Sequence, residues 1–180
     1  MVREARMEHT EYGLAPAGDG WFVVGVPEAA WMTNEYFGEA CVFEGDAVKF
    51  PRVGYTIHVL HPGQPNGLYH REEDQEDFLV LGGECIAIVE GEERRLRAWD
   101  FLHCPAGTEH IFVGAGEEPC VIFMAGGREH RGSAVYPRSE AAARYGASVE
   151  SESTPSESPY APFPKWRPGP PDRLTGLPFG

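Results

Sequence analysis

The sequence predicts an all-β protein built as a single sandwich or barrel. Short apolar runs recur between positions 53 and 125, with Gly, Pro or acidic residues between them, at the spacing of about eight to twelve residues that is typical of such folds. The 22 glycines and 16 prolines favour short elements and tight turns over a helical bundle. The 180 residues suffice for one compact domain but not for two ordinary ones.

Residues 1–50 show no clean hydrophobic period. Aromatic residues and glycines are mixed in this stretch, and only 20–26 and 39–43 read as short strands. We therefore expect an N-terminal extension that contributes edge strands.

The pattern becomes regular in the next segment, which we take as the barrel, residues 51–130. Apolar or alternating runs bounded by turn residues predict one strand each. The expected strands are 55–60, 67–72, 77–81, 85–91, 93–99, 100–105, 110–114 and 120–125.

A short helical segment is expected within residues 131–148. Ser139 can cap its N-terminus, Glu140 suits the positive end of the helix dipole, and Gly146 can end it. We expect this helix to pack on the outside of the barrel.

Residues 149–180 form a proline-rich tail. It holds eight of the sixteen prolines, which prevents long ladders or helices, so an extended chain is predicted. A solvated tail would not usually carry the apolar area of four aromatic side chains, so we expect it to lie along a surface of its own chain or of a partner subunit. These aromatic residues are Tyr160, Phe163, Trp166 and Phe179.

The charge balance restricts the partners. With 15 basic and 28 acidic residues the formal net charge is −13, which repels nucleic-acid backbones and anionic lipid surfaces. The first ten residues contain two arginines and two glutamates without an apolar run, so we expect neither a signal peptide nor a membrane anchor. We therefore expect a cytoplasmic protein.

Four scattered cysteines without a CxxC pair predict reduced, mostly buried thiols at Cys41, Cys85, Cys104 and Cys120.

One segment combines histidine with several carboxylates. If 67–72 is a strand, His70 and Glu72 point to the same face, because side chains alternate along a strand. If 73–75 form a turn, Glu76 opens the returning strand and can point to the same place. Burying such a cluster is costly unless a cation compensates it, so the segment indicates a metal site.

A second segment supplies a further ligand. The turn Pro105-Ala106-Gly107 ends one strand and starts another at His110, whose neutral imidazole suits a first-row divalent metal. Two hairpins therefore offer four candidate ligands: His70, Glu72, Glu76 and His110.

These two segments resemble the paired motifs of the cupin family. His70, Glu72, Glu76 and Gly83 follow the spacing of the first motif, and fifteen residues separate it from the second. Pro105, Gly107 and His110 follow the spacing of the second motif. The resemblance covers residues 55–125 and implies a cupin β-barrel, a double-stranded β-helix or jelly roll, around a mononuclear metal.

The sequence departs from the family pattern at several positions. The second histidine of the first motif is Glu72, Trp99 and Gly114 replace the glycine and asparagine that open and close the second motif, and the opening glycine of the first motif is displaced by one residue to Gly63. Two imidazoles and two carboxylates around a divalent ion give a neutral site, a weaker Lewis acid than a site with three imidazoles. This argues against oxalate-type chemistry and favours Mn or Fe, with Zn still allowed.

Other interpretations stay open for three residues. Glu72 lies in an acidic run that is often a solvated turn, so it is either a ligand or a surface residue facing the arginines of the 93–99 strand. His58 and His103 are candidates for a catalytic base or a contact to a ligand, or are hydrogen-bonded histidines on the outer face.

The resemblance implies an enzyme that acts on a small organic molecule by isomerase, lyase or dioxygenase chemistry at a divalent metal. The alternatives are a non-catalytic small-molecule binder with a structural or absent metal, and a scaffold with a decayed site. Because barrels of this family pair through outer strands, and the tail could wrap a neighbour, we expect a homodimer.

Overall fold

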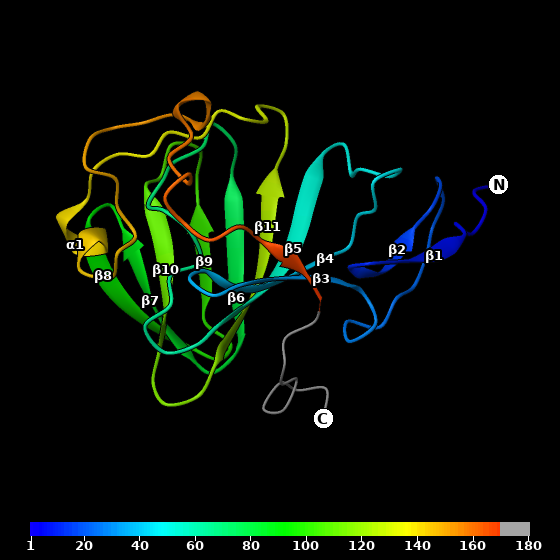
Figure 1. The fold of residues 1–180 in the computed structure, drawn as a ribbon, viewed down its shortest axis with the longest axis horizontal. Coiled ribbons are helices and arrows are strands. Elements are labelled where there is room, and N and C mark those ends of the chain that lie inside the picture. The colour runs from blue at the N-terminus through cyan, green and yellow to red at the C-terminus, as the bar shows by residue number, and fades with distance from the viewer. Residues whose placement is uncertain (170–180) are drawn as a thin grey trace.

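The structure is a computed structural model that describes residues 1–169, so Phe179 and the end of the predicted tail lie outside the described residues. It is mostly β (Figure 1). The strands are β1 (Met7–Thr10), β2 (Gly13–Pro16), β3 (Ala30–Asn34), β4 (Gly38–Val42), β5 (Val53–Leu60), β6 (Glu76–Gly82), β7 (Glu84–Val89), β8 (Glu92–Arg97), β9 (Phe101–Cys104), β10 (His110–Ala115), β11 (Cys120–Gly127) and β12 (Arg167–Pro168).

Two antiparallel sheets form the barrel. The larger has seven strands in the order β12-β3-β4-β5-β11-β6-β9, and the smaller has three in the order β10-β7-β8. The pair β1-β2 forms a separate hairpin that projects from the end of the molecule opposite the smaller sheet (Figure 1). The predicted all-β barrel is confirmed.

The main core lies between the two sheets. It consists of alternate residues of the central strands, which point inward because side chains alternate along a strand. Its buried members are Leu60, Phe78, Val80, Cys85, Ala87, Cys104, Phe112, Cys120 and Ile122. Since Glu76 is two residues before Phe78 on β6, its side chain points into the same interior.

The helical segment is a single turn, α1 (Glu140–Ala143). As expected, Ser139 is its N-cap, with the hydroxyl accepting a hydrogen bond from the Ala142 N–H, and Gly146 follows it with a φ of 68°. Ala141 and Ala142 pack on the outer face of the smaller sheet, so the helix lies outside the barrel. Within residues 1–169, no helix is long and apolar enough to cross a membrane.

Two expected strands do not form. In 20–26 only Trp21 makes a bridge, to Glu4, in the N-terminal segment. The segment 67–72 has isolated bridges at His70 and Arg71, because its backbone bonds go to β10, to Val135 and to the loop after α1 instead of to one partner strand. All four cysteines are buried free thiols, as expected.

The described part of the tail lies along its own chain. After a 3-10 turn, η1 (Pro155–Glu157), the chain crosses the barrel and ends as β12, which pairs with β3 at the edge of the larger sheet (Figure 1). Phe163 contacts the rings of Tyr36 and Phe37, and Tyr160 contacts Phe37 and Tyr136. The expectation of a surface-bound tail is therefore confirmed for its described aromatic residues.

Candidate metal centre

Three predicted ligands converge at one end of the barrel interior. One ligand atom each from His70, Glu76 and His110 lies within 4.8 Å of the others. The Glu76 Oε2 atom is 3.3 Å from His110 Nε2 and 4.0 Å from His70 Nε2. Donor atoms bound at about 2.1 Å to one ion are typically separated by about 3.0 to 3.4 Å, so small side-chain shifts would let all three share a cation.

Each ligand comes from a different part of the fold. Glu76 is the first residue of β6 in the larger sheet, and His110 is the first residue of β10 in the smaller sheet. His70 and His110 exchange two backbone hydrogen bonds of 3.1 and 2.8 Å, which hold their rings 4.8 Å apart. The ladder contact therefore brings the two imidazoles together, and Glu76 approaches them from the opposite sheet.

The orientation of both imidazoles is fixed by their own backbone neighbours. The Nδ1 atom of His70 lies 2.8 Å from the Leu68 carbonyl oxygen, and that of His110 lies 3.0 Å from the Thr108 carbonyl oxygen. A carbonyl can only accept, so each Nδ1 carries the proton and donates it. The Nε2 lone pairs are therefore left facing Glu76, which is the arrangement that a metal-ligating histidine requires.

Burial disfavours the charged form of each of these three side chains. It lowers the pKa of His110 to about 3, with the nearby His70 as a second cause, and it also lowers the pKa of His70. The pKa of Glu76 is raised to about 8, mainly by burial and then by the charges of Glu72 and Asp74. A divalent cation would stabilise the charged form of Glu76, which burial disfavours. It would also bind the imidazoles in the neutral form that burial favours. The donor set, two imidazoles and a carboxylate, fits a divalent transition metal.

Glu72 lies at the rim of this site. It lines, with Glu76, a cleft of about 290 Å³, and its charge contributes to the raised pKa of Glu76. It is not one of the three residues whose ligand atoms cluster. Its role as a fourth ligand stays a prediction. The other residues of the cleft wall are Gly54, Thr56, Met124, Gly126, Gly127, Arg128, Arg131 and Gly132.

The structure places His103 away from the cluster. It lies on β9 opposite Asp77, and its Nδ1 atom is 2.7 Å from the Asp77 carboxylate. Since Asp77 follows Glu76 along the strand, the pair lies on the outer face of the sheet. The neighbouring Cys104 points inward instead, and burial, followed by the charge of Glu76, raises its thiol pKa to about 12.

His58 faces the interior but lies in another part of it. Across β11, Glu76 is in register with Gly54, and His58 is four residues farther along β5, or about 13 Å. It is 7% exposed, and burial lowers its pKa to about 4. The structure therefore does not bring either predicted base, His58 or His103, to the three ligands.

Two tyrosines that the sequence did not indicate lie beside the centre. The Tyr136 ring is 6.0 Å from the His70 ring, and it packs edge-on against the Tyr160 ring at 5.6 Å. Burial, then Glu72, raises the pKa of Tyr136. No local pattern could have identified them, because the first lies in an irregular segment that we expected to be part of a helical region, and the second lies in the tail.

Comparison with known proteins agrees with this fold. Residues 56–126 match the family model described as "Cupin domain". No match was found among curated proteins.

Solved structures give partial likenesses. The polyketide cyclase RemF from Streptomyces resistomycificus is 15% identical, with a TM-score of 0.53 over 62% of this chain and 82% of that one. A proposed sugar phosphate isomerase from Acidithiobacillus ferrooxidans is 24% identical, with a TM-score of 0.47 over 54% of this chain and 64% of that one. A sugar phosphate isomerase of the cupin superfamily from Silicibacter pomeroyi is 26% identical, with a TM-score of 0.45 over 50% of this chain and 59% of that one.

The match to the two isomerase structures spans less than two thirds of their length. The likeness to RemF supports the fold alone. The matched family model covers β6 and β10, which carry Glu76 and His110, and the segment that carries His70. Residues 56–126 of this chain therefore match the cupin domain in sequence.

Proposed function

We propose that the protein binds one divalent transition metal, Mn, Fe or Zn, through His70, Glu76 and His110 and acts there on a small organic molecule. The observation that carries this proposal is the orientation of the two imidazoles, whose Nδ1 protons are donated to backbone carbonyls while both Nε2 lone pairs face one carboxylate. When bound, such a metal supplies Lewis acidity toward a substrate oxygen, as isomerase, lyase and dioxygenase chemistry requires.

The chain's own groups around the centre support an enzyme. Tyr136 has a raised pKa and therefore keeps its proton, so its hydroxyl can donate a hydrogen bond to a substrate beside His70. Glu72 lies in the cleft that leads to Glu76 and can accept a proton or serve as a further ligand. Three protein ligands leave coordination positions for a substrate, which a closed structural site would not.

Elemental analysis of the purified protein tests the proposal. We expect about one equivalent of metal in the wild type and loss of that metal in the double variant His70→Ala/His110→Ala. The matched control His9→Ala/His61→Ala removes two exposed histidines and should keep the metal. A wild type without bound metal after loading with Mn, Fe and Zn in turn would refute the site. Stoichiometric metal without turnover in a screen of small organic acids, sugars and phenols would support the non-catalytic binder instead.

A further inference from the structure

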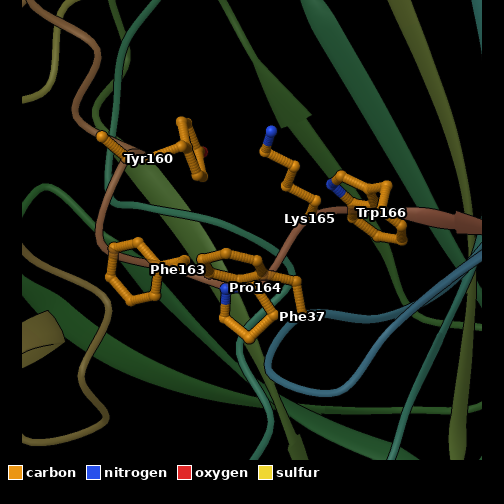
Figure 2. Close-up of a pocket in the computed structure, with 7 residues that line it drawn as sticks. Phe37, Tyr160, Phe163, Pro164, Lys165 and Trp166 are labelled. Carbon is orange, nitrogen blue, oxygen red and sulfur yellow. The ribbon is translucent and has the colours of Figure 1, made fainter.

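A second cavity lies under residues 160–166 of the tail, which we call the strap. Its volume is about 410 Å³, within the about 300–1,000 Å³ range of small-molecule sites. Figure 2 shows that the strap provides nearly all of the wall and that Phe37, from the turn between β3 and β4, completes it. The strap residues in the wall are Tyr160, Ala161, Phe163, Pro164, Lys165 and Trp166.

The strap is held at both ends, so the cavity is preformed. The Tyr160 hydroxyl accepts a hydrogen bond of 3.0 Å from the Leu68 N–H at one end. The Asn34 amide donates one of 2.8 Å to the Pro164 carbonyl oxygen, and β12 follows directly. The ring of Phe163 packs 5.0 Å from that of Phe37 between these anchors. A preformed wall lowers the entropy cost of binding.

Two polar groups in this wall make no hydrogen bond or ion pair with the rest of the described protein. Both side chains are exposed, and within residues 1–169 neither the Lys165 ammonium nor the Trp166 indole N–H has a hydrogen-bond or ion-pair partner in the protein, although the net charge of the chain is −13. The nitrogen end of Trp166 faces the Lys165 side chain, and the Tyr160 ring lies on the other side of that lysine (Figure 2). One cation and one N–H donor thus accompany aromatic rings in a single cavity.

A third polar group, with one atom that lacks a hydrogen-bond partner among the described residues, lies next to Trp166. The His58 ring is 5.9 Å from the Trp166 ring, its other polar contact is with the Phe37 backbone, and its buried Nε2 atom has no hydrogen-bond partner among the described residues. Buried polar atoms in proteins are nearly always satisfied. Phe37 and Trp166 both line the cavity, so this orphan atom lies beside a wall that a guest molecule would contact.

We propose that the strap cavity binds an aromatic carboxylate. The planar carboxylate would accept hydrogen bonds from Lys165 Nζ and Trp166 Nε1, and the ring would pack against Tyr160 and Phe37. A cationic guest would be repelled by Lys165, and a purely apolar guest would gain no hydrogen bond or ion pair from the ammonium and the indole N–H. The proposal does not depend on a metal at His70, Glu76 and His110.

Calorimetric titration of the full chain with benzoate tests this inference, with benzamide as the neutral analogue of the same shape. We expect one benzoate per chain and binding of benzamide at least about fivefold weaker. Lys165→Met should lower the benzoate affinity by about fivefold or more, whereas Lys49→Met, which removes the other lysine of the chain, should not change it. Trp166→Phe keeps an aromatic ring but loses the N–H donor, so it should also weaken the binding of benzoate.

Metal binding and strap binding can be separated. The double variant His70→Ala/His110→Ala should retain benzoate binding even though it loses the metal. Absence of benzoate binding up to about 10 mM would overturn the inference. So would equal affinity in wild type and Lys165→Met, or loss of binding only in the double histidine variant, which would place the carboxylate at the metal. Whether the wild type holds a metal is decided separately, by elemental analysis.

Discussion

The Nε2 atom of His110 lies 3.3 Å from the Oε2 atom of Glu76, although the two residues open strands of different sheets. The contact exists only when the smaller sheet closes over the larger one. The same closure buries both groups and shifts their pKa values in opposite directions. Folding and cation binding are therefore coupled at this pair.

Replacing the buried carboxylate of Glu76 should stabilise the protein without metal and remove its stabilisation by metal. The pKa of Glu76 is about 8 in the folded protein against 4.5 for the ordinary group, so metal-free stability is lost as pH rises from about 4.5 to 8. We expect Glu76→Gln to stabilise the metal-free protein by about 3 kcal/mol at pH 7, since the amide carries no charge to bury. Urea denaturation after chelator treatment measures this difference.

Added metal should then raise the melting temperature of the wild type but not that of Glu76→Gln. The exposed Glu118→Gln is the matched control and should behave as the wild type in both states. A metal-free Glu76→Gln variant that is less stable than the wild type at pH 7 would contradict the predicted burial of a costly charge.

His58 should make the protein sensitive to mild acid. Its pKa is about 4 in the folded protein and 6.5 ordinarily, so between these values the unfolded chain binds the extra proton and stability falls as pH decreases. Between pH 7.5 and pH 5 this group should cost about 2 kcal/mol. Urea denaturation should show that His58→Phe loses about that much less stability than the wild type over this range. Parallel losses in the two proteins would mean that His58 is not buried in the neutral form.

Asn34 should hold the strap in place. Its buried side chain accepts hydrogen bonds from the Tyr36 and Phe37 N–H groups and donates one to the Pro164 carbonyl oxygen. We expect Asn34→Ala to lower the free energy of unfolding by about 2 kcal/mol and to speed amide exchange at Gly169, which bonds to the Trp31 carbonyl oxygen.

Gln64→Ala is the control for this effect. Gln64 makes comparable side-chain hydrogen bonds, to Glu35 and His61, but does not touch the strap. Its replacement should leave exchange at Gly169 unchanged. Equal exchange in the Asn34 and Gln64 variants would argue that β12 is held by its strand pairing alone.

The expected homodimer should use the outer face of β9. This edge strand exposes 63% of Phe101, and the preceding Trp99 is 75% exposed. Phe101 is in register with Leu79, which continues in register to Phe123, so an apolar row crosses the sheet from this edge. Light scattering should give a dimer mass for the wild type and a monomer mass near 19.9 kDa for Phe101→Glu.

Val23→Glu replaces a comparably exposed apolar residue in the N-terminal segment and should remain dimeric. A wild type that is monomeric at micromolar concentration would refute the dimer. A dimer that survives Phe101→Glu would place the interface elsewhere.

The regular alternation of residues 53–125 was enough to predict the barrel strands, because period-two patterns are local. The 67–72 strand was wrong because hydrogen bonding there depends on three distant partners, and 20–26 was wrong because aromatic residues without alternation do not identify a ladder. The strands β1, β2 and β3 had no periodic signal in the mixed N-terminal segment.

For the site, the spacing of the two motifs predicted His70, Glu76 and His110 as ligands, and the structure brings one ligand atom of each within 4.8 Å of the others. Local alternation gives the direction of Glu76, which opens a strand, but that of His70 is set by its backbone bonds to His110. Only the tertiary structure decided which side of the sheet His103 takes, how far His58 lies from the cluster, and that Tyr136 and Tyr160 stand beside it. These relationships depend on how the sheets close and where the tail returns. Local sequence periodicity contains no information about such distances.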